Sequence, residues 1–367
     1  MKKLKVIISG GGTGGHIFPA IAIAKALEKK VKKIEILFVG AKGRMEMTKI
    51  PAEGYSIEGL WISGLQRKLT AKNISFPFKV ISSLLRARKI IKKFKPDIAI
   101  GTGGYASGPL LYVAAKKNIA TLVQEQNSYP GITNMILSKV VDKVCVAYDN
   151  MEKFFPKNKI IFTGNPIRQD VLEFESKKQL GISHFNLDEN KKTVLVIGGS
   201  LGAKTINRAI DKNLLFFAEN NLNLIWQTGK TYQKKAEQSV KEKAVKGINA
   251  YTFIEEMDLA YGAADIIISR AGAIAISELC CIGKPTILIP SPNVSEDHQT
   301  KNAQAVVNKK AALLVKDNEA DSKLVNCLSE LIEDARLQYE LAKNIKNLAV
   351  TDAADKIANE ALILSKK

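Results

Sequence analysis

A run of glycines near the start of the sequence has the composition of an anion-binding turn. The segment GGGTGGH, residues 10–16, follows an apolar stretch, residues 4–9, and precedes a run with helical spacing, residues 17–30. Glycines let a backbone turn tightly and approach an anion, and the free N–H groups at a helix start point toward it. The segment therefore predicts a phosphate site between a strand and a helix.

The same glycines fit the Gly-x-Gly-x-x-Gly spacing of a dinucleotide site, so an oxidoreductase is one alternative. A nicotinamide site needs an acid at the end of the second strand, where it binds the ribose hydroxyls. Here the second apolar run, residues 34–39, continues into GAKGR without a carboxylate. Lys42 or Arg44 could pair with a 2′-phosphate, which leaves an NADP-dependent oxidoreductase open.

Two further glycine clusters follow strand-like runs. GTGGYASG, residues 101–108, follows DIAI, and GGSLGA, residues 198–203, follows TVLVI. Tight turns alone favour glycine, and this would explain any one of the loops. Three loops are more than one dinucleotide needs, and ligands of such folds bind at the carboxyl ends of strands. Together they favour a site for phosphates and sugars.

The segment SRAGAIAISE, residues 269–278, joins an apolar strand to an apolar helix. Its small residues would admit a ligand close to the backbone, and Glu278 could accept hydrogen bonds from two vicinal hydroxyls. A plain turn with a solvated glutamate is the alternative. The polar stretch 292–304 follows another strand, and its His298 and Gln299 suit recognition of hydroxyl groups.

Positioning these loops requires an α/β framework. Strand-like runs alternate with helical patterns in both halves of the chain, which predicts parallel sheets covered by helices. Strands are expected near residues 4–9, 34–39, 97–100, 120–124, 143–147 and 160–163, and then near 193–199, 223–227, 250–253, 265–269 and 285–290. The fold class is therefore α/β, with two Rossmann-like domains facing each other across a cleft. Polar residues between 167 and 192 suggest a connecting segment.

Composition fits a globular chain with an anionic partner. The 367 residues suffice for two domains, the mean hydropathy is −0.04, and no apolar run approaches the length of a spanning helix. The net charge is +19, from 55 basic and 36 acidic residues. Ten basic residues stand against Asp97 alone between residues 61 and 100. Such clustering favours nucleic acid, a membrane surface or a phosphorylated substrate.

The ordered set of motifs closely resembles the MurG family of bacterial glycosyltransferases over nearly the whole chain. The matching segments are GGTGGHIFPA, GTGGYASGP, EQN, GNPIR, GGSLGA, SRAGAIAISE and DHQTKNA. The resemblance implies the glycosyltransferase-B fold and a transfer of N-acetylglucosamine from UDP-GlcNAc to lipid I, the undecaprenyl diphosphate sugar, with inversion. It also implies an acceptor and membrane domain at 1–165, a UDP-GlcNAc-binding domain at 166–350 and a last helix, 351–367, packed back on the first domain.

The resemblance also assigns contacts residue by residue. Expected substrate-binding positions are Thr13, Gly14, Gly15 and Asn127 on the sugar and diphosphate side, and Arg168, Ser200, Ile254, Ala273, Ile274, Ala275, Ile276, Ser277, Glu278 and Gln299 on the donor side. The Ile254 backbone would read uracil, Glu278 the ribose, and Gln299 the GlcNAc hydroxyls. Many relatives carry His where this chain has Gln124, and this difference argues against an essential base at that position.

The reaction that this family performs needs a base for the acceptor hydroxyl. His16 is the first candidate, because an imidazole titrates near neutral pH, and Glu125 is the second. His16 could instead cap the loop or bind phosphate. No metal and no cofactor are expected: the chain has no Asp-x-Asp motif in its loops, and the acidic residues at 317–321 look like a solvated turn.

The basic and apolar stretch at 67–95 is expected to rest on anionic lipid at the cytoplasmic face of the bacterial membrane, as a peripheral contact. Two other classes remain as alternatives to the lipid I transferase: a same-fold glycosyltransferase with another lipid acceptor, and the NADP oxidoreductase. A nucleic-acid binder is not expected, since the chain lacks the interleaved aromatic platform of single-strand binders.

Overall fold

The computed structural model describes residues 3–64, 75–199, 202–243 and 246–366. The chain divides into two compact units, each with its own sheet. The first comprises Met1–Ile167 together with Asp352–Lys367, and the second comprises Arg168–Thr351. No helix among the described residues has both the length and the apolar character needed to cross a membrane.

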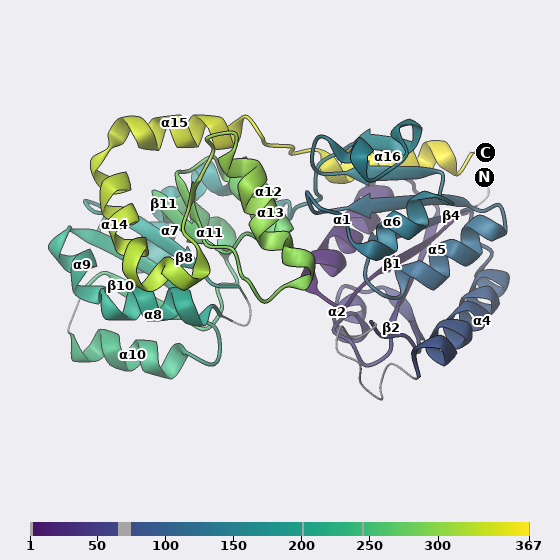
Figure 1. Cartoon of the computed structure of the whole chain (residues 1–367), viewed down its shortest axis with the longest axis horizontal. Helices are drawn as coiled ribbons and strands as arrows, with labels where there is room; N and C mark the ends of the chain where they lie inside the picture. Colours follow the sequence, from purple (N-terminus) through teal and green to yellow (C-terminus); the bar gives the residue numbers. More distant parts are fainter. Residues whose placement is uncertain (1–2, 65–74, 200–201, 244–245, 367) are drawn as a thin grey trace. The chain divides into compact units, whose positions relative to one another are not determined.

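The described strands of the first unit form a seven-stranded parallel sheet in the order β3-β2-β1-β4-β5-β6-β7. Figure 1 labels β1, β2 and β4 of this sheet. The bounds of the strands are β1 Leu4–Gly10, β2 Ile34–Ala41, β3 Ser56–Leu60, β4 Ile98–Gly103, β5 Ala120–Glu125, β6 Lys143–Val146 and β7 Ile160–Phe162. Its helices are α1 Gly14–Lys30, α2 Glu46–Ala52, α4 Phe76–Phe94, α5 Ser107–Lys116, α6 Ile132–Ser138 and α16 Ala353–Leu364.

Helices cover both faces of this sheet because successive strand residues point to opposite sides. Val6 and Ile8 of β1 pack in a core with α1 and α16, whereas Ile7 packs in a core with α4, α5 and α6. The last helix, α16, therefore returns to the first unit and lies against α1. Its apolar residues Ile357 and Ala358 are fully buried there.

In the second unit, the strands among the described residues form a six-stranded parallel sheet in the order β10-β9-β8-β11-β12-β13. The strands are β8 Lys192–Ile197, β9 Leu222–Gln227, β10 Ile248–Tyr251, β11 Ile266–Ser269, β12 Thr286–Leu288 and β13 Leu313–Leu314. The helices are α7 Lys178–His184, α8 Lys204–Lys212, α9 Leu214–Glu219, α10 Gln233–Glu242, α11 Met257–Ala263, α12 Ala273–Ile282, α13 His298–Val307, α14 Ala320–Glu333 and α15 Ala335–Lys346.

Both sheets reverse their strand order at a central pair, β1 and β4 in the first unit and β8 and β11 in the second. Loops that leave neighbouring strands in opposite directions open a crevice at the carboxyl edge of such a sheet. The glycine segments 10–15 and 101–108 leave β1 and β4, and the segments 198–203 and 270–272 leave β8 and β11. The fold thus brings the sequence motifs together in pairs.

The segment between 167 and 192 is not the connecting segment that its polarity predicted. It forms a 3₁₀ segment, Asp170–Lys177, and then α7, and both pack on α11. Val171, Phe174, Ile182 and Phe185 supply buried side chains to the core of the second unit. Their spacing puts these apolar residues on one side of the segment, while Glu173, Glu175 and Lys178 are exposed.

Candidate active site

The first two glycine loops interlock at the carboxyl edge of the first sheet. Thr102 donates a hydrogen bond from Oγ1 to the carbonyl of His16 at 2.8 Å. A Cβ on Gly10 would lie 1.9 Å from Thr102 Oγ1, and one on Gly104 would lie 2.4 Å from the Gly11 carbonyl oxygen. Side chains at these two positions would collide, so glycine is required for the loops to pack backbone to backbone.

His16 lies in the first turn of α1, and its ring orientation is fixed. Nδ1 is 2.9 Å from the carbonyl oxygen of Gly11. Because a carbonyl only accepts hydrogen bonds, Nδ1 carries a proton, and in the neutral ring Nε2 then keeps its lone pair. Nε2 lies against Gly103, where a Cβ would approach it to 2.8 Å. A neutral imidazole held in this tautomer can accept a proton at Nε2.

Thr13, Gly14 and Gly15 form the start of α1 beside His16. The amides of His16 and Ile17 both bond back to the Thr13 carbonyl. The amides of Gly14 and Gly15 precede them and, as first-turn N–H groups, have no acceptor within the helix. The residues are exposed or half-buried, and the positive end of the helix dipole lies there. This is suitable geometry for an anion.

Glu125, the second candidate base, ends β5 and is 1% exposed. Its Oε1 accepts from the amide and the side chain of Asn127, and its Oε2 accepts from the amide of Gly131 and the side chain of Asn134. Four N–H donors hold the carboxylate in place. These contacts let Glu125 shape the loop 126–131, and its role as the second candidate base stays a prediction.

Glu46 is a site residue that sequence reasoning missed. It begins α2, its residue exposure is 0%, and it accepts from the Gly12 amide at 2.8 Å and from the Ala41 amide at 2.9 Å. A Cβ on Gly11 or on Gly40 would lie within 2.5 Å of its side chain. The sequence has no carboxylate directly at the end of β2, but Glu46 follows slightly later and accepts a hydrogen bond from the glycine loop itself.

In the second unit, Glu278 lies in α12 at the centre of a buried group. Its Oε1 accepts from Arg168 Nε at 3.3 Å and its Oε2 accepts from the Tyr261 hydroxyl at 3.0 Å. Burial raises the pKa of the Glu278 carboxyl, although Arg168 and Tyr261 act in the opposite direction. Burial, together with the neighbouring Glu278, also raises the pKa of Tyr261 well above its usual value. Tyr261 was not a predicted site residue.

The opening of α12 has the small residues that the sequence indicated. Gly272 is the N-cap in extended backbone, and α12 begins with Ala273, Ile274 and Ala275, which are half-buried. Ser277 donates its hydroxyl back to the Ala273 carbonyl. Ile276 is different, because its side chain lies in the core and its amide bonds to Gly272. A contact between Ile276 and the substrate stays a prediction.

The remaining donor-side candidates are held by local hydrogen bonds. The Ile254 amide donates to Gln227 Oε1 at 3.2 Å, and the Ser291 amide donates to Gln299 Oε1 at 2.8 Å. Gln299 lies in the first turn of α13 and not in a loop. Ser200 lies outside the described residues.

Asp317 is not part of a solvated turn, which corrects the expectation for the acidic residues at 317–321. Arg270 Nη1 lies 2.5 Å from Asp317 Oδ1, and Arg270 also donates to the Thr205 hydroxyl and the Ile289 carbonyl. The group ties the turn after β11 to the start of α8.

Comparison with known proteins decides the family. Models of the glycosyltransferase family 28 N-terminal and C-terminal domains match residues 6–146 and 193–357. The UDP-N-acetylglucosamine--N-acetylmuramyl-(pentapeptide) pyrophosphoryl-undecaprenol N-acetylglucosamine transferase of Flavobacterium psychrophilum is 53% identical, covering 99% of this chain and 98% of that protein. The protein of the same name from Parabacteroides distasonis is 52% identical, with 100% of both chains covered.

The crystal structure of Acinetobacter baumannii MurG superposes with a TM-score of 0.80 at 28% identity, covering 98% of this chain and 99% of that one. The chain belongs to the MurG family.

Membership of the MurG family confirms the predicted fold class. Two Rossmann-like units with parallel sheets are the glycosyltransferase-B architecture, and the family models assign one domain to each half of the chain. The chain is an N-acetylglucosaminyltransferase by family, so the NADP oxidoreductase alternative is wrong.

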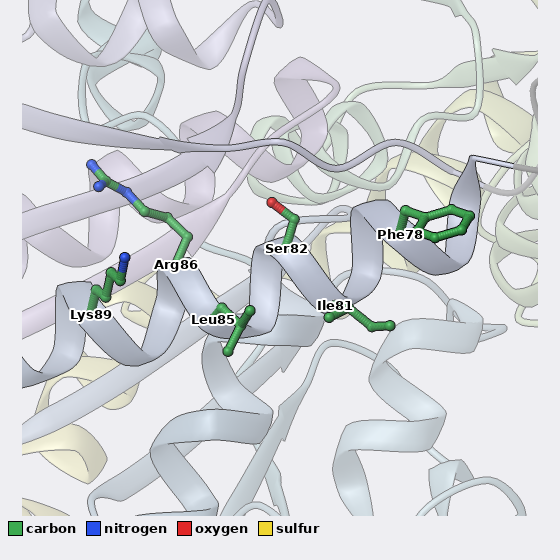
Figure 2. A pocket seen from close by; sticks show the side chains of 6 residues that line it. All are labelled: Phe78, Ile81, Ser82, Leu85, Arg86 and Lys89. Atoms are coloured by element: carbon green, nitrogen blue, oxygen red, sulfur yellow. The ribbon is translucent and has the colours of Figure 1, made fainter.

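This MurG-family chain also carries an exposed apolar surface on α4. Phe78, Ile81 and Leu85 are 66%, 57% and 58% exposed, and with Ser82, Arg86 and Lys89 they line a pocket along the helix (Figure 2). The opposite side of α4 contributes Ala87, Ile90 and Ile91 to the core. Trp61, 51% exposed, lies beside the helix and is contacted by Lys79. Residues 67–74 of the predicted stretch lie outside the described part of the chain.

Proposed function

We propose that this protein transfers N-acetylglucosamine from UDP-GlcNAc to the C4 hydroxyl of the N-acetylmuramyl residue of lipid I, giving lipid II for peptidoglycan. The observation that carries the proposal is the full-length identity of about one half with transferases whose names state this donor and acceptor. The tautomer of His16 at the start of α1 supports it, because the reaction needs a base.

The chemical step is a single displacement at the anomeric carbon. The acceptor O4 forms a bond to C1 of GlcNAc while the bond from C1 to the UDP oxygen breaks, and UDP leaves with the electron pair. The hydroxyl proton passes to Nε2 of His16. Attack from the face opposite UDP inverts the configuration at C1.

Two helix starts suit the two phosphate groups of this reaction. We assign the amides of Gly14 and Gly15 to the diphosphate of the lipid acceptor, with Thr13 and Asn127 beside the reacting sugar. We assign the start of α12, at Ala273, Ile274, Ala275 and Ser277, to UDP. Preorganised N–H groups stabilise the negative charge that develops on the leaving phosphate.

Residues of the second unit are assigned to the ribose, diphosphate, uracil and GlcNAc groups of the donor. Glu278 would exchange its present partners for the ribose hydroxyls, which releases Arg168 toward the diphosphate. The backbone of Ile254 would read uracil, and Gln299 and Ser200 would contact the GlcNAc and phosphate side. Under this assignment the first unit handles the acceptor and the second unit handles the donor.

The test of the function is release of UDP from UDP-GlcNAc with and without a lipid I analogue. We expect release only with the analogue present, and a disaccharide product with the new bond in the β configuration. Turnover with a diacylglycerol acceptor but not with lipid I would support the same-fold alternative and overturn the proposal.

We also propose that α4 contacts the anionic surface of the cytoplasmic leaflet, which holds the lipid acceptor. Its apolar residues Phe78, Ile81 and Leu85 are flanked by exposed basic side chains at Arg88 and Lys89. An apolar face with a cationic rim binds acidic bilayers without spanning them. Arg86 is partly committed to Glu58, 2.7 Å away, so it contributes less to such a surface.

A further inference from the structure

The Gly11–Gly12 peptide group of the first loop is bonded at both ends. Its N–H, on Gly12, donates to Glu46 Oε2 at 2.8 Å. Its carbonyl, on Gly11, accepts from His16 Nδ1 at 2.9 Å. Glu46 and His16 are therefore connected through a single planar amide, although they are 30 positions apart in the chain.

We propose that Glu46 is the positioning residue for His16. It acts as the carboxylate of a carboxylate–histidine pair in which the peptide group lies between the two side chains. The proposal rests on His16 being the base of the proposed function. In a direct pair, a carboxylate holds the imidazole in one tautomer and stabilises the imidazolium that forms. Here the carboxylate polarises the peptide N–H, which makes the peptide carbonyl a stronger acceptor for Nδ1–H.

The surroundings of Glu46 are built for this contact. The side chain is fully buried, and its second oxygen is fixed by the Ala41 amide at the end of β2. A Cβ on Gly11 would collide with the Glu46 carboxylate, and a Cβ on Gly40 would collide with Glu46 Cγ, so the loop and the end of β2 both pack closely around this side chain. A rigid carboxylate at this point fixes the plane of the peptide, and the plane sets the direction of the Gly11 carbonyl.

The same contact divides the amides of the loop between two tasks. Gly12 N–H is occupied by Glu46 and is not available to a ligand. Gly14 and Gly15, at the start of α1, keep their amides for the anion. Glu46 thus orients His16 and does not contact a ligand. Removal of the Glu46 carboxylate should therefore affect the rate of the chemical step more than the binding of the donor.

The first test is a double-mutant cycle with Glu46→Gln and His16→Ala. We expect Glu46→Gln to lower kcat about 10- to 100-fold, the range known for carboxylates that orient metal-binding histidines, with little change in the KM for UDP-GlcNAc. In the His16→Ala background the same change should cost no further activity, because residues that act as a unit are not additive. Additive losses would overturn the proposal, since they indicate a general effect on the loop.

Asp142→Asn is the matched control. Asp142 also accepts a backbone amide, that of Thr121 at 2.9 Å, but at the amino end of β5, away from the loops. We expect kcat to stay at the wild-type value in this variant. An equal loss of kcat in Asp142→Asn and Glu46→Gln would contradict a specific role for Glu46.

The second test reads the tautomer of His16 directly, without substrate. The chain has three histidines, so ¹⁵N-histidine spectra are simple, and the His16→Ala variant assigns the signal. We expect an Nδ1–H tautomer in the wild type and a mixture of tautomers in Glu46→Gln. An Nε2–H tautomer in the wild type, or an unchanged pattern in the variant, would overturn the proposal. If UDP release fails to depend on lipid I, the proposed function is wrong, and this measurement still decides the role of Glu46.

Discussion

The two units hold their buried carboxylates in different ways. In the first unit, Glu46 accepts from two backbone amides, and two of the four donors on Glu125 are backbone amides as well. In the second unit, the partners of Glu278 are the guanidinium of Arg168 and the hydroxyl of Tyr261, both at the ends of side chains.

Partners of the first kind are fixed in place, whereas partners of the second kind can be exchanged for a ligand. A backbone amide cannot leave without unfolding its loop, so Glu46 and Glu125 hold the first unit in one shape before a ligand arrives. A side chain can rotate to a new partner, so Arg168 can release Glu278 to a pair of ligand hydroxyls. This difference supports the proposed division, with proton transfer in the first unit and binding of the sugar nucleotide in the second.

The largest effect should come from removing His16, the proposed base in the first unit. We expect His16→Ala to lower kcat about 10²- to 10⁴-fold, the usual contribution of a positioned acid or base. The KM for UDP-GlcNAc should change little, because the donor is assigned to the second unit. Steady-state assays of UDP release give both constants, and turnover near the wild-type rate would remove His16 from the mechanism.

The support of the loop 126–131 should be costly to break. Glu125→Gln leaves at least one buried N–H donor without an acceptor, which costs about 2 kcal/mol in the free energy of unfolding. Urea denaturation measures the change, with Asp142→Asn as a control in which the carboxylate is exposed and the cost should be smaller. Wild-type stability of Glu125→Gln would show that the amide network is not rigid.

The units should also differ at their surfaces. Ile81→Glu on α4 is expected to weaken binding to vesicles that contain anionic lipid about tenfold, since the burial of one large apolar side chain is lost. Leu215→Glu on α9 replaces a similarly exposed residue of the second unit and should leave binding unchanged. Vesicle co-sedimentation compares the two variants, and equal losses would rule out a specific surface on α4.

A smaller effect is expected in the pH dependence of stability. Burial raises the pKa of folded Glu278 above its ordinary 4.5, so the folded state binds more protons than the unfolded state above pH 4.5. The stabilising contribution is complete below pH 4.5 and is lost as the pH rises through the folded pKa. The unfolding free energy of the wild type minus that of Glu278→Gln should therefore fall above pH 4.5. A rise of this difference with pH would contradict a Glu278 carboxyl whose pKa is raised by burial.

The sequence was sufficient for the framework because parallel strands buried on both faces read as continuous apolar runs. The glycine loops after β1, β4 and β8 were predicted from their positions at the ends of such runs. The short edge strand β3, Ser56–Leu60, was missed, since Ser56 and Glu58 give it a mixed composition. The Asp170–Phe185 segment was misread because its charged residues outnumber the four apolar ones that reach the core.

Site residues were found where they belong to a motif and missed where they act through a distant partner. His16 and Glu278 lie inside conspicuous segments. Glu46 and Tyr261 lie in ordinary helical stretches, and only the fold brings Glu46 to Gly12 and Tyr261 to Glu278. A buried hydrogen bond between residues far apart in the chain leaves no local pattern.

The most direct test of the division between the units is the dissociation constant of UDP-GlcNAc, measured by calorimetry for the wild type, His16→Ala and Glu278→Gln. We expect His16→Ala to bind the donor as the wild type does. Glu278→Gln should bind it at least about tenfold more weakly, because charge-assisted hydrogen bonds to the ribose are lost. Loss of donor affinity in His16→Ala with wild-type affinity in Glu278→Gln would contradict the account.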